Sequence, residues 1–250
     1  MDRIELIGLE GISEIKSGDK LAVQISEAAR RTDVNISPND ILVVAQKVIS
    51  KAEDRLVRLA DVAPSVFAQT LADECKVDAR LVELVLRESR RIVRMSERVL
   101  ITETHHGLIC ANAGIDRSNV AGEDYVSLLP VDPDASARQL RVELDQLLNI
   151  KVAIIITDTF GRPWREGLTN VAIGLAGINP LEDLRYQHDD HGKLLKATVL
   201  ATADEVAAAA GLVMRKTKRV PVVLARGFAY EPGEHTAREL QRVRELDLFR

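Results

Sequence analysis

The chain has 250 residues and a formal net charge of −4 at pH 7, and aromatic residues make up only 3% of it. Such a charge gives no global field that would attract nucleic acid or a membrane surface, and so few aromatic residues argue against a base-stacking surface. The 46% apolar and 29% charged residues are ordinary for a globular protein with a substantial core. We therefore expect a soluble protein that binds neither nucleic acid nor membrane.

Two further features of the sequence indicate its compartment. It contains no apolar run of about 18 residues and no basic head followed by an apolar stretch at the N-terminus. Its two cysteines, Cys75 and Cys110, lie far apart and form no C-x-x-C pair, which fits a reducing environment. The expected location is the cytoplasm.

The first 20 residues combine short apolar runs with glycine turns. Residues 12–15 lie between two of these turns, so their backbone amides can face a ligand, although an edge strand followed by a turn is the simpler interpretation. An amphipathic helix is predicted over 21–31, because its apolar residues recur at helical spacing.

A buried strand is predicted over 41–45, where all five residues are apolar. Gln46, Lys47, Ser50 and Lys51 follow it directly. Two lysines and a serine at a strand end can hold phosphate groups. Solvated charge at the start of a helix or hairpin explains the pattern equally well.

Two helices are predicted next, over 64–75 with Pro64 in its first turn and over 78–94 with Asp78 as its cap. A strand over 98–103 then precedes a short strand and a polar loop that carries Asp116 and Asn119. This loop matters because a carboxylate and an amide are oxygen donors of the kind that hard cations prefer.

The adjacent histidines His105 and His106 lack the partners of a zinc site and are expected at the surface. Further along, a rigid turn leads into a helix that Asp134 is predicted to cap. The apolar face of that helix is expected to consist of Leu140, Leu144, Leu147 and Leu148.

The most informative stretch follows this helix. Residues 152–156 are apolar and predict a strand buried on both faces. Asp158 and Thr159 come at its end, on what we expect to be a loop shaped by Gly161, Pro163 and Gly167. An acid beside a hydroxyl suits Mg²⁺, and Asp158 with Asp116 would supply two carboxylates from separate segments to a cation beside a phosphate.

Arg162 and Arg165 stand on the same predicted loop and suit bidentate recognition of a phosphate or carboxylate. In the next apolar segment, Gly174 and Gly177 permit close backbone approach. A strand is predicted over 196–201, a helix over 202–214 with a capping box from Thr202 to Glu205, and a last strand over 220–225. Thr236 and Glu239 are predicted to cap a C-terminal helix.

These elements predict a compact α/β fold, of mixed α+β type, in which strands and helices alternate. We treat 1–250 as a single unit, with two intertwined subdomains as the alternative. The sequence contains neither G-x-x-x-x-G-K-[ST] nor G-x-G-x-x-G. The fold is therefore expected to be neither a P-loop fold nor a Rossmann fold.

Five motifs, in this order, together resemble the coenzyme F-420-0:γ-glutamyl ligase family over nearly the whole chain. They are Gly11-Ile-Ser-Glu-Ile15 with Gly18-Asp19, Val48-Ile-Ser-Lys-Ala-Glu53, Cys110-Ala-Asn-Ala-Gly-Ile-Asp-Arg-Ser-Asn119, Leu129-Pro-Val-Asp-Pro-Asp-Ala-Ser-Ala137, and Ile156-Thr-Asp-Thr-Phe-Gly-Arg162 with Ala172-Ile-Gly-Leu-Ala-Gly177.

The resemblance implies a GTP-dependent ligase that adds L-glutamate, and further γ-linked glutamates as an extension, to the deazaflavin coenzyme F-420-0. It implies Mg²⁺ or Mn²⁺ as one or two cations, K⁺ as a further candidate, and a homodimer. The implied metal ligands are Asp116, Asp158 and Thr159, and the implied catalytic residues are Asp116, Asp158, Lys51 and Arg162. The implied nucleotide contacts are Ile12, Ser13, Glu14, Ile15, Gln46, Lys47, Lys51, Asn119, Met214 and Lys216.

The sequence departs from the family pattern after the predicted helix 202–214. Met214-Arg-Lys-Thr217 places Lys216 where the family has a glutamate or glutamine near a second metal or the nucleotide. A protonated lysine has no acceptor for a cation, whereas it can contact phosphate as a point charge. Tyr186 likewise stands in a segment where the family commonly has glycine, which bears on the choice of acceptor.

The implied reaction forms an acyl phosphate from the acceptor carboxylate and GTP, which the glutamate amine then attacks. The residues would act by positioning and by charge neutralisation. Two other functions stay open from sequence: a metal-dependent nucleotide phosphohydrolase that uses the same acids, and a homologue that binds coenzyme or nucleotide without catalysis.

Overall fold

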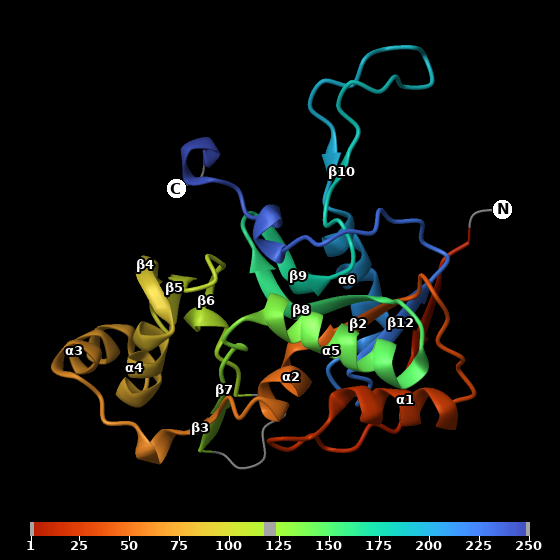
Figure 1. Cartoon of the computed structure of the whole chain (residues 1–250). Coiled ribbons are helices and arrows are strands. Elements are labelled where there is room, and N and C mark those ends of the chain that lie inside the picture. The colour runs from red at the N-terminus through yellow and green to blue at the C-terminus, as the bar shows by residue number, and fades with distance from the viewer. Residues whose placement is uncertain (1–2, 118–123, 249–250) are drawn as a thin grey trace.

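The computed structural model describes residues 3–117 and 124–248, and its centre is a five-stranded sheet (Figure 1). In spatial order its strands are β1 (Glu5–Gly8), β12 (Val222–Arg226), β2 (Ile41–Ala45), β8 (Ala153–Arg162) and β9 (Arg165–Ala176). Strands β2 and β8 run parallel and the other neighbours in this sheet run antiparallel. The mixed α/β class is confirmed, and such a sheet differs from the parallel sheet of a Rossmann fold.

Helices cover both faces of this sheet and give it two hydrophobic cores. On one face Ile154 and Ile156 of β8 pack with α1 (Leu21–Arg31) and α5 (Pro133–Leu148). On the other face Ile155 packs with α6 (Thr202–Met214). The continuous apolar runs of β2 and β8 therefore reflect burial on both faces, as predicted from the sequence.

A smaller lobe lies beside the sheet and has a buried cluster of its own (Figure 1). It contains α3 (Val66–Cys75), α4 (Ala79–Arg87), β4 (Ser89–Ser96), β5 (Val99–Thr104) and β6 (Ile109–Ala111). Between lobe and sheet lie α2 (Gln46–Ala52) and the paired strands β3 (Leu56–Arg58) and β7 (Tyr125–Ser127). In this lobe the helices α3 and α4 are consecutive, and so are the strands β4, β5 and β6. The predicted alternation of strands and helices throughout the chain was therefore wrong here.

The remaining elements are short. Strands β10 (Glu182–Asp183) and β11 (Val199–Leu200) form the base of an arm, residues 182–200, that projects from the body (Figure 1). The 3-10 turns are η1 (Leu59–Asp61), η2 (Asn112–Gly114), η3 (Ala237–Leu240) and η4 (Arg244–Leu246). No helix in the described part of the chain is long and apolar enough to cross a membrane.

Several predicted boundaries are confirmed. The helix over 21–31 and the strand over 41–45 have the predicted bounds. Asp78 caps α4, because its carboxylate accepts a hydrogen bond from the backbone N–H of Arg80. Thr236 and Glu239 form a capping box, although the element that they cap is the 3-10 turn η3 rather than a regular helix.

Two predictions around the helices α3 and α4 were wrong. The helix predicted over 78–94 ends at Arg87, and residues 89–96 form β4, which pairs with β5. This strand gains its hydrogen bonds from a neighbour that helical periodicity cannot reveal. The helix predicted from Pro64 begins at Val66, because Ser65 is its cap and its side chain accepts from the backbone N–H of Ala68.

The start of α5 also differs from the prediction. Its cap is Asp132, which accepts from the backbone N–H of Ala135 at 2.9 Å. Asp134 instead turns inward, where it accepts from the backbone N–H groups of Leu175 and Ala237, and burial raises the pKa of its carboxyl. Asp134 therefore ties α5, β9 and η3 together. On the same helix Leu147 is exposed rather than part of the apolar face.

Elements in the second half were predicted in type more accurately than in extent. The predicted loop after Asp158 is a β-hairpin, since β8 continues to Arg162 and β9 starts at Arg165. The strand predicted over 196–201 is reduced to Val199–Leu200, and the last strand covers Val222–Arg226. Thr202 makes no helix cap, because its hydroxyl donates to the backbone oxygen of Pro180.

The close approach predicted at Gly174 holds the α5 layer against the sheet. A Cβ atom at this position would lie 2.5 Å from the carbonyl carbon and oxygen of Pro133. We therefore expect Gly174→Ala to lower the free energy of unfolding by about 1–3 kcal/mol or more, since the obstacle is backbone that cannot rotate away. Urea denaturation measures this change.

Gly161→Ala is the matched control, because the nearest atom to its added methyl group would be Leu168 Cδ2 at 3.9 Å. Its effect should stay within about 1 kcal/mol. Equal losses in the two variants would show that the close contact at Gly174 does not limit stability.

Candidate functional site

The candidate site lies where the parallel strands β2 and β8 point their carboxyl ends. The ladder between them runs from Ile41 opposite Ala153 to Ala45 opposite Thr157. Beyond it, the chain of β2 turns into α2 with Gln46 and Lys47, whereas β8 continues through Asp158. Polar side chains from two segments distant in sequence are thus brought to one edge of the sheet, the usual ligand position in such sheets.

Asp158 is the half-buried acid of this site. Burial raises the pKa of its carboxyl to about 6, and the negative charge of Asp116 adds to this rise. The backbone N–H of Thr159 and the positive charges of Lys216 and Lys47 oppose it. The charge of Asp116 therefore acts on Asp158, as expected for two acids that face the same edge of the sheet.

Asp116 reaches the site from the segment after η2 and is fixed by its backbone. Its N–H donates to the Ser127 oxygen at 3.0 Å, and its oxygen accepts from the Ser127 N–H at 2.8 Å. Its carboxylate forms an ion pair with Lys47, with 2.7 Å between Lys47 Nζ and Asp116 Oδ2. Asn119, predicted on the same loop, lies outside the described residues.

Lys51, the lysine predicted to contact phosphate, is buried in α2 and forms an ion pair with Glu14. This contact joins the predicted nucleotide turn, residues 12–15, to α2. Within that turn Ile15 is buried in the main core and Ile12 packs against it, whereas Ser13 is exposed. A shallow pocket next to the turn is lined by Ile12 with Lys218 and Arg219, so the segment after α6 faces it.

Gln46 is almost fully buried at the start of α2. Its amide nitrogen donates to the hydroxyl of Ser50 at 2.6 Å and to the backbone oxygen of Leu128 at 3.0 Å. Its amide oxygen is a buried acceptor without a partner in the part of the chain that the structure describes. An orphaned acceptor of this kind calls for a donor from water or ligand.

Thr159 faces the α6 side of the hairpin rather than the Asp158 side. Successive residues of a strand alternate between faces, and Phe160 packs in the α1–α5 core while Thr159 bonds across the hairpin to Asn170. The Thr159 hydroxyl donates to Asn170 Oδ1 at 3.0 Å. The structure therefore places the hydroxyl of Thr159 and the carboxylate of Asp158 on different faces.

Asn170 is a residue that the sequence analysis did not identify. Its amide nitrogen lies 3.8 Å from the sulfur of Met214, and Gly211 of α6 leaves it room, because a Cβ there would come within 3.1 Å of it. Only the pairing of β8 with β9 reveals that Asn170 is opposite Thr159. Met214 itself is buried in the core between α6 and the sheet. Lys216 is exposed, and its positive charge acts on Asp158.

The predicted arginines stand at the exposed tip of the β8–β9 hairpin. Arg162 donates to the backbone oxygen of Glu166 at 3.1 Å, and Arg165 is exposed. Trp164 turns between them with a positive φ of 56° and is 77% exposed. The tip thus presents two cations and an aromatic ring to solvent, apart from the acids at the sheet edge.

Three other candidates have structural explanations. Cys110 is buried, and desolvation with the nearby charge of Asp158 raises the pKa of its thiol to about 12, so it stays protonated. His105 and His106 bond to backbone oxygens of Arg87 and Pro130, both at 2.8 Å. Each histidine thus links its turn to a neighbouring segment through a backbone oxygen.

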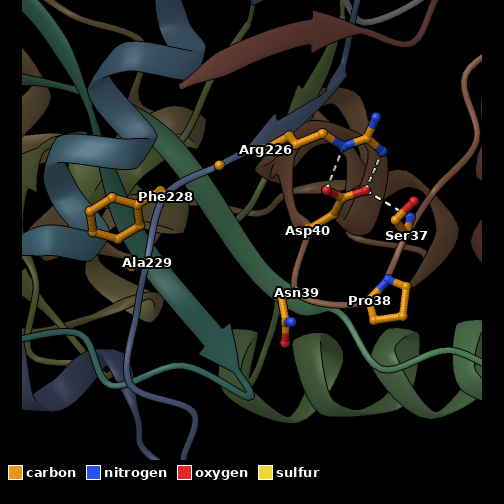
Figure 2. A pocket seen from close by; sticks show the side chains of 8 residues that line it. Ser37, Pro38, Asn39, Asp40, Arg226, Phe228 and Ala229 are labelled. Atoms are coloured by element: carbon orange, nitrogen blue, oxygen red, sulfur yellow. Dashed lines mark hydrogen bonds and ion pairs between the residues drawn. The ribbon is translucent and has the colours of Figure 1, made fainter. Parts of the chain in front are cut away.

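A second pocket, of about 500 Å³, opens at the opposite edge of the sheet (Figure 2). Its wall contains an ion pair in which the guanidinium of Arg226 donates to both carboxylate oxygens of Asp40, at 2.9 and 2.6 Å. Asp40 also accepts from the backbone N–H of Ser37 (Figure 2). These groups satisfy one another and lock β12 to the start of β2, so we regard this pocket as structural.

Comparison with known proteins confirms the resemblance along most of the chain. The model of the family described as F420-0:Gamma-glutamyl ligase matches residues 11–227. The Coenzyme F420:L-glutamate ligase of Methanopyrus kandleri is 44% identical over 253 aligned positions, which cover 99% of this chain and 97% of that protein. The proteins of the same name from Methanothermobacter thermautotrophicus and Methanocaldococcus jannaschii are 40% and 37% identical, and 99% of this chain is covered in both.

The buried charge of Asp158 should make stability depend on pH. A carboxyl whose pKa is raised on folding does not lower the stability of the fold while it is protonated. The loss of stability grows as the pH rises from the ordinary pKa of the group, near 4, to its pKa in the folded protein, about 6. In the presence of a chelator we expect Asp158→Asn to melt about 2–6 °C above the wild type at pH 8. The two proteins should melt together near pH 4.

Thermal melts followed by circular dichroism across this range measure the difference. Asp73→Asn removes an exposed carboxylate of α3 and should leave the melting temperature unchanged at both pH values. A melting temperature of Asp158→Asn that is lowered equally at pH 4 and pH 8 would contradict the assignment of a destabilising charge.

Proposed function

Because this chain belongs to the F420-0:gamma-glutamyl ligase family, we propose that it is a ligase that joins L-glutamate to the deazaflavin coenzyme F420-0. The observation that carries the proposal is the match along nearly the whole chain to relatives named Coenzyme F420:L-glutamate ligase. The cluster of acids and lysines at the sheet edge supports it, since Asp116, Asp158 and Lys47 lie within the matched range.

We propose GTP as the co-substrate that activates the coenzyme. Lysines from α2 and from the segment after α6 converge on the carboxyl ends of β2 and β8: Lys47 and Lys216 act on Asp158, and Lys51 lies one helical turn beyond Lys47. Such a concentration of point charges suits a polyphosphate. The buried amide oxygen of Gln46 can accept a hydrogen bond from a nucleotide or from water beside it.

The acids also fit a hard divalent cation. Asp116 and Asp158 both contribute carboxylates to this edge of the sheet, and the negative charge of Asp116 helps to raise the pKa of Asp158. Among residues 3–117 and 124–248 no group of three or more His, Cys, Asp or Glu side chains is gathered for a metal. Mg²⁺ and Mn²⁺ suit such a sparse site, because one or two carboxylates with phosphate oxygens and water complete their coordination.

In the proposed reaction a carboxylate oxygen of the coenzyme attacks the γ-phosphorus of GTP, forming an acyl phosphate and releasing GDP. The amine of glutamate then attacks the acyl carbon, and the new amide bond forms as inorganic phosphate leaves. A bound Mg²⁺ or Mn²⁺ would neutralise phosphate charge. Asp116 and Asp158 would hold it, and Lys51 would orient the phosphates, so the protein acts by positioning and electrostatics.

The hairpin tip is the proposed contact for the acidic substrates. Arg162 and Arg165 keep guanidinium groups exposed at the end of the two longest strands of the sheet. A guanidinium binds carboxylates and phosphodiesters in bidentate fashion. We propose that one of these arginines binds the coenzyme or glutamate and that Arg162 contributes directly to turnover.

The test is a ligation assay with purified protein, coenzyme F420-0, L-glutamate, GTP and Mn²⁺, read by mass spectrometry. We expect a product enlarged by one glutamyl residue. Asp158→Ala should reduce the rate of ligation at least about 100-fold, because alanine has no carboxylate with which to hold the cation that neutralises phosphate charge. Asp73→Asn, which removes an exposed acid of the small lobe, should act as wild type.

The alternatives give different results in the same assay. Release of phosphate from GTP without any need for glutamate would identify a nucleotide hydrolase instead of a ligase. Binding of coenzyme or GTP with no product and no phosphate release would identify a non-catalytic homologue. Retention of ligation in Asp158→Ala would remove this acid from the proposed site.

We further propose that the protein is a homodimer and that the arm over 182–200 contributes to its interface. The arm projects from the body (Figure 1). On it Tyr186 and Leu194 are 78% and 43% exposed. Apolar side chains on an extension that cannot bury them within its own subunit are typical of an interface. A second copy of the chain, placed by twofold symmetry, would cover both arms at once.

Light scattering after size exclusion tests this proposal. We expect a mass of two chains for the wild type and of one chain for the double variant Tyr186→Glu and Leu194→Glu, since charge opposes burial at an interface. Lys193→Glu, an exposed change on the same arm, should remain dimeric. A double variant that stays dimeric would place the interface elsewhere.

A further inference from the structure

Lys47 forms an ion pair with the carboxylate of Asp116. The proposed function assigns the same carboxylate to a divalent cation. We propose that this ion pair is a latch: Lys47 holds Asp116 while the site is free of ligand and releases it when a polyphosphate takes up the lysine. The binding of divalent cation and of polyphosphate would then be coupled through Lys47. This inference rests on the proposed function, because it concerns the order in which the same site fills.

In this pair the lysine has the longer and more flexible side chain, whereas the backbone that carries Asp116 is fixed. Asp116 is anchored by its two backbone hydrogen bonds to Ser127, of 3.0 and 2.8 Å. Lys47 sits in the first turn of α2, and its ammonium ends a flexible four-carbon stem. Rotation of that stem can carry the charge away from Asp116 without any change in the backbone.

The ion pair of Lys47 and Asp116 is also largely shielded from solvent, so water screens its charges less than it would at the surface. The side chains of Lys47 and Asp116 are 15% and 27% exposed, and 2.7 Å separates the charged atoms. A cation that binds Asp116 must either displace the ammonium from Oδ2 or bind the other carboxylate oxygen beside that positive charge. Lys216 acts on Asp158 in the same sense, since its positive charge favours the ionised acid. Both acids already have positive charge beside them, so a cation alone has little to gain.

A polyphosphate changes this balance, because it offers Lys47 several negative oxygens in exchange for one carboxylate. Asp116 then loses its counter-ion at the moment when new negative charge arrives, and both changes favour a divalent cation. Lys51 shows the same arrangement, since it is paired with Glu14 on the exposed turn 12–15. By thermodynamic reciprocity, the cation must strengthen polyphosphate binding through this contact by the same factor.

Binding of Mn²⁺ alone to the intact protein, followed by electron paramagnetic resonance, tests the latch without catalysis. We expect Lys47→Met to bind Mn²⁺ about tenfold more tightly than wild type in the absence of nucleotide. Lys47→Arg keeps the positive charge and should bind Mn²⁺ as wild type does. Lys76→Met is the matched control, because it breaks an ion pair of equal length, 2.7 Å to Glu97, in the small lobe.

The same titration with saturating GDP measures the coupling. Direct contact between phosphate and Mn²⁺ should tighten binding in every variant, but the factor should be about tenfold smaller in Lys47→Met than in wild type. A thermal melt establishes that the variants are folded, and Lys47→Gln, which keeps a polar side chain without charge, should repeat the result if Lys47→Met fails to fold.

Unchanged Mn²⁺ affinity in folded Lys47→Met, or an equal gain in Lys76→Met, would overturn the latch. Absence of Mn²⁺ binding in both wild type and Lys47→Met would overturn it as well. These results are distinct from failure of the proposed function. Ligation by wild type with no effect of Lys47 on Mn²⁺ removes only the latch, whereas a tenfold gain in a protein that forms no ligation product removes only the ligase.

Discussion

The candidate site depends on one structural constraint, the parallel pairing of β2 with β8. Two parallel neighbours must end at the same edge of a sheet, whereas antiparallel neighbours end at opposite edges. Ala45 and Thr157 stand opposite each other at that end, so the residues that follow them, Lys47 and Asp158, are delivered to the same place. Gly174 and Asp134 hold α5 against the neighbouring strand β9 of the same sheet.

Charge sets the second constraint. A half-buried carboxylate such as Asp158 is unfavourable by itself, as its raised pKa shows. The fold accepts it because positive charge from Lys47 and Lys216 lies close and because Asp116, the other acid, has its own ion pair. Acids and bases gathered at a sheet edge for no structural benefit are characteristic of sites that bind charged ligands. The Asp40 and Arg226 pair at the opposite edge differs, because the two groups form a bidentate ion pair and backbone groups of residues 35 and 37 complete their hydrogen bonds.

The sequence predicts the elements that obey local rules. The helix over 21–31 shows helical periodicity and the strand over 41–45 is uniformly apolar, and both have the predicted bounds. The prediction fails where contacts with other segments decide the structure. Periodicity alone would continue α4 through the residues of β4, but these residues pair with β5. The proximity of Asp116 and Asp158 follows from motifs. The ion pairs of Lys47 and Lys51 and the bond between Thr159 and Asn170 do not, because register and side-chain direction are tertiary properties.

Strand alternation also limits how the hairpin can share its ligands. Asp158 and Thr159 are neighbours in sequence, yet their side chains have different surroundings. The Thr159 hydroxyl donates to Asn170 on the α6 side. The pKa of the Asp158 carboxyl is shifted by the charges of Asp116 and Lys47. In this structure the hydroxyl of Thr159 is therefore directed to the Asn170 side chain and not to the carboxylate of Asp158. Lys216 reaches Asp158 from the α6 end and, being protonated, adds charge without an acceptor oxygen. Lys216 thus places an ammonium charge near Asp158 at a position where the family has an acidic or amide side chain.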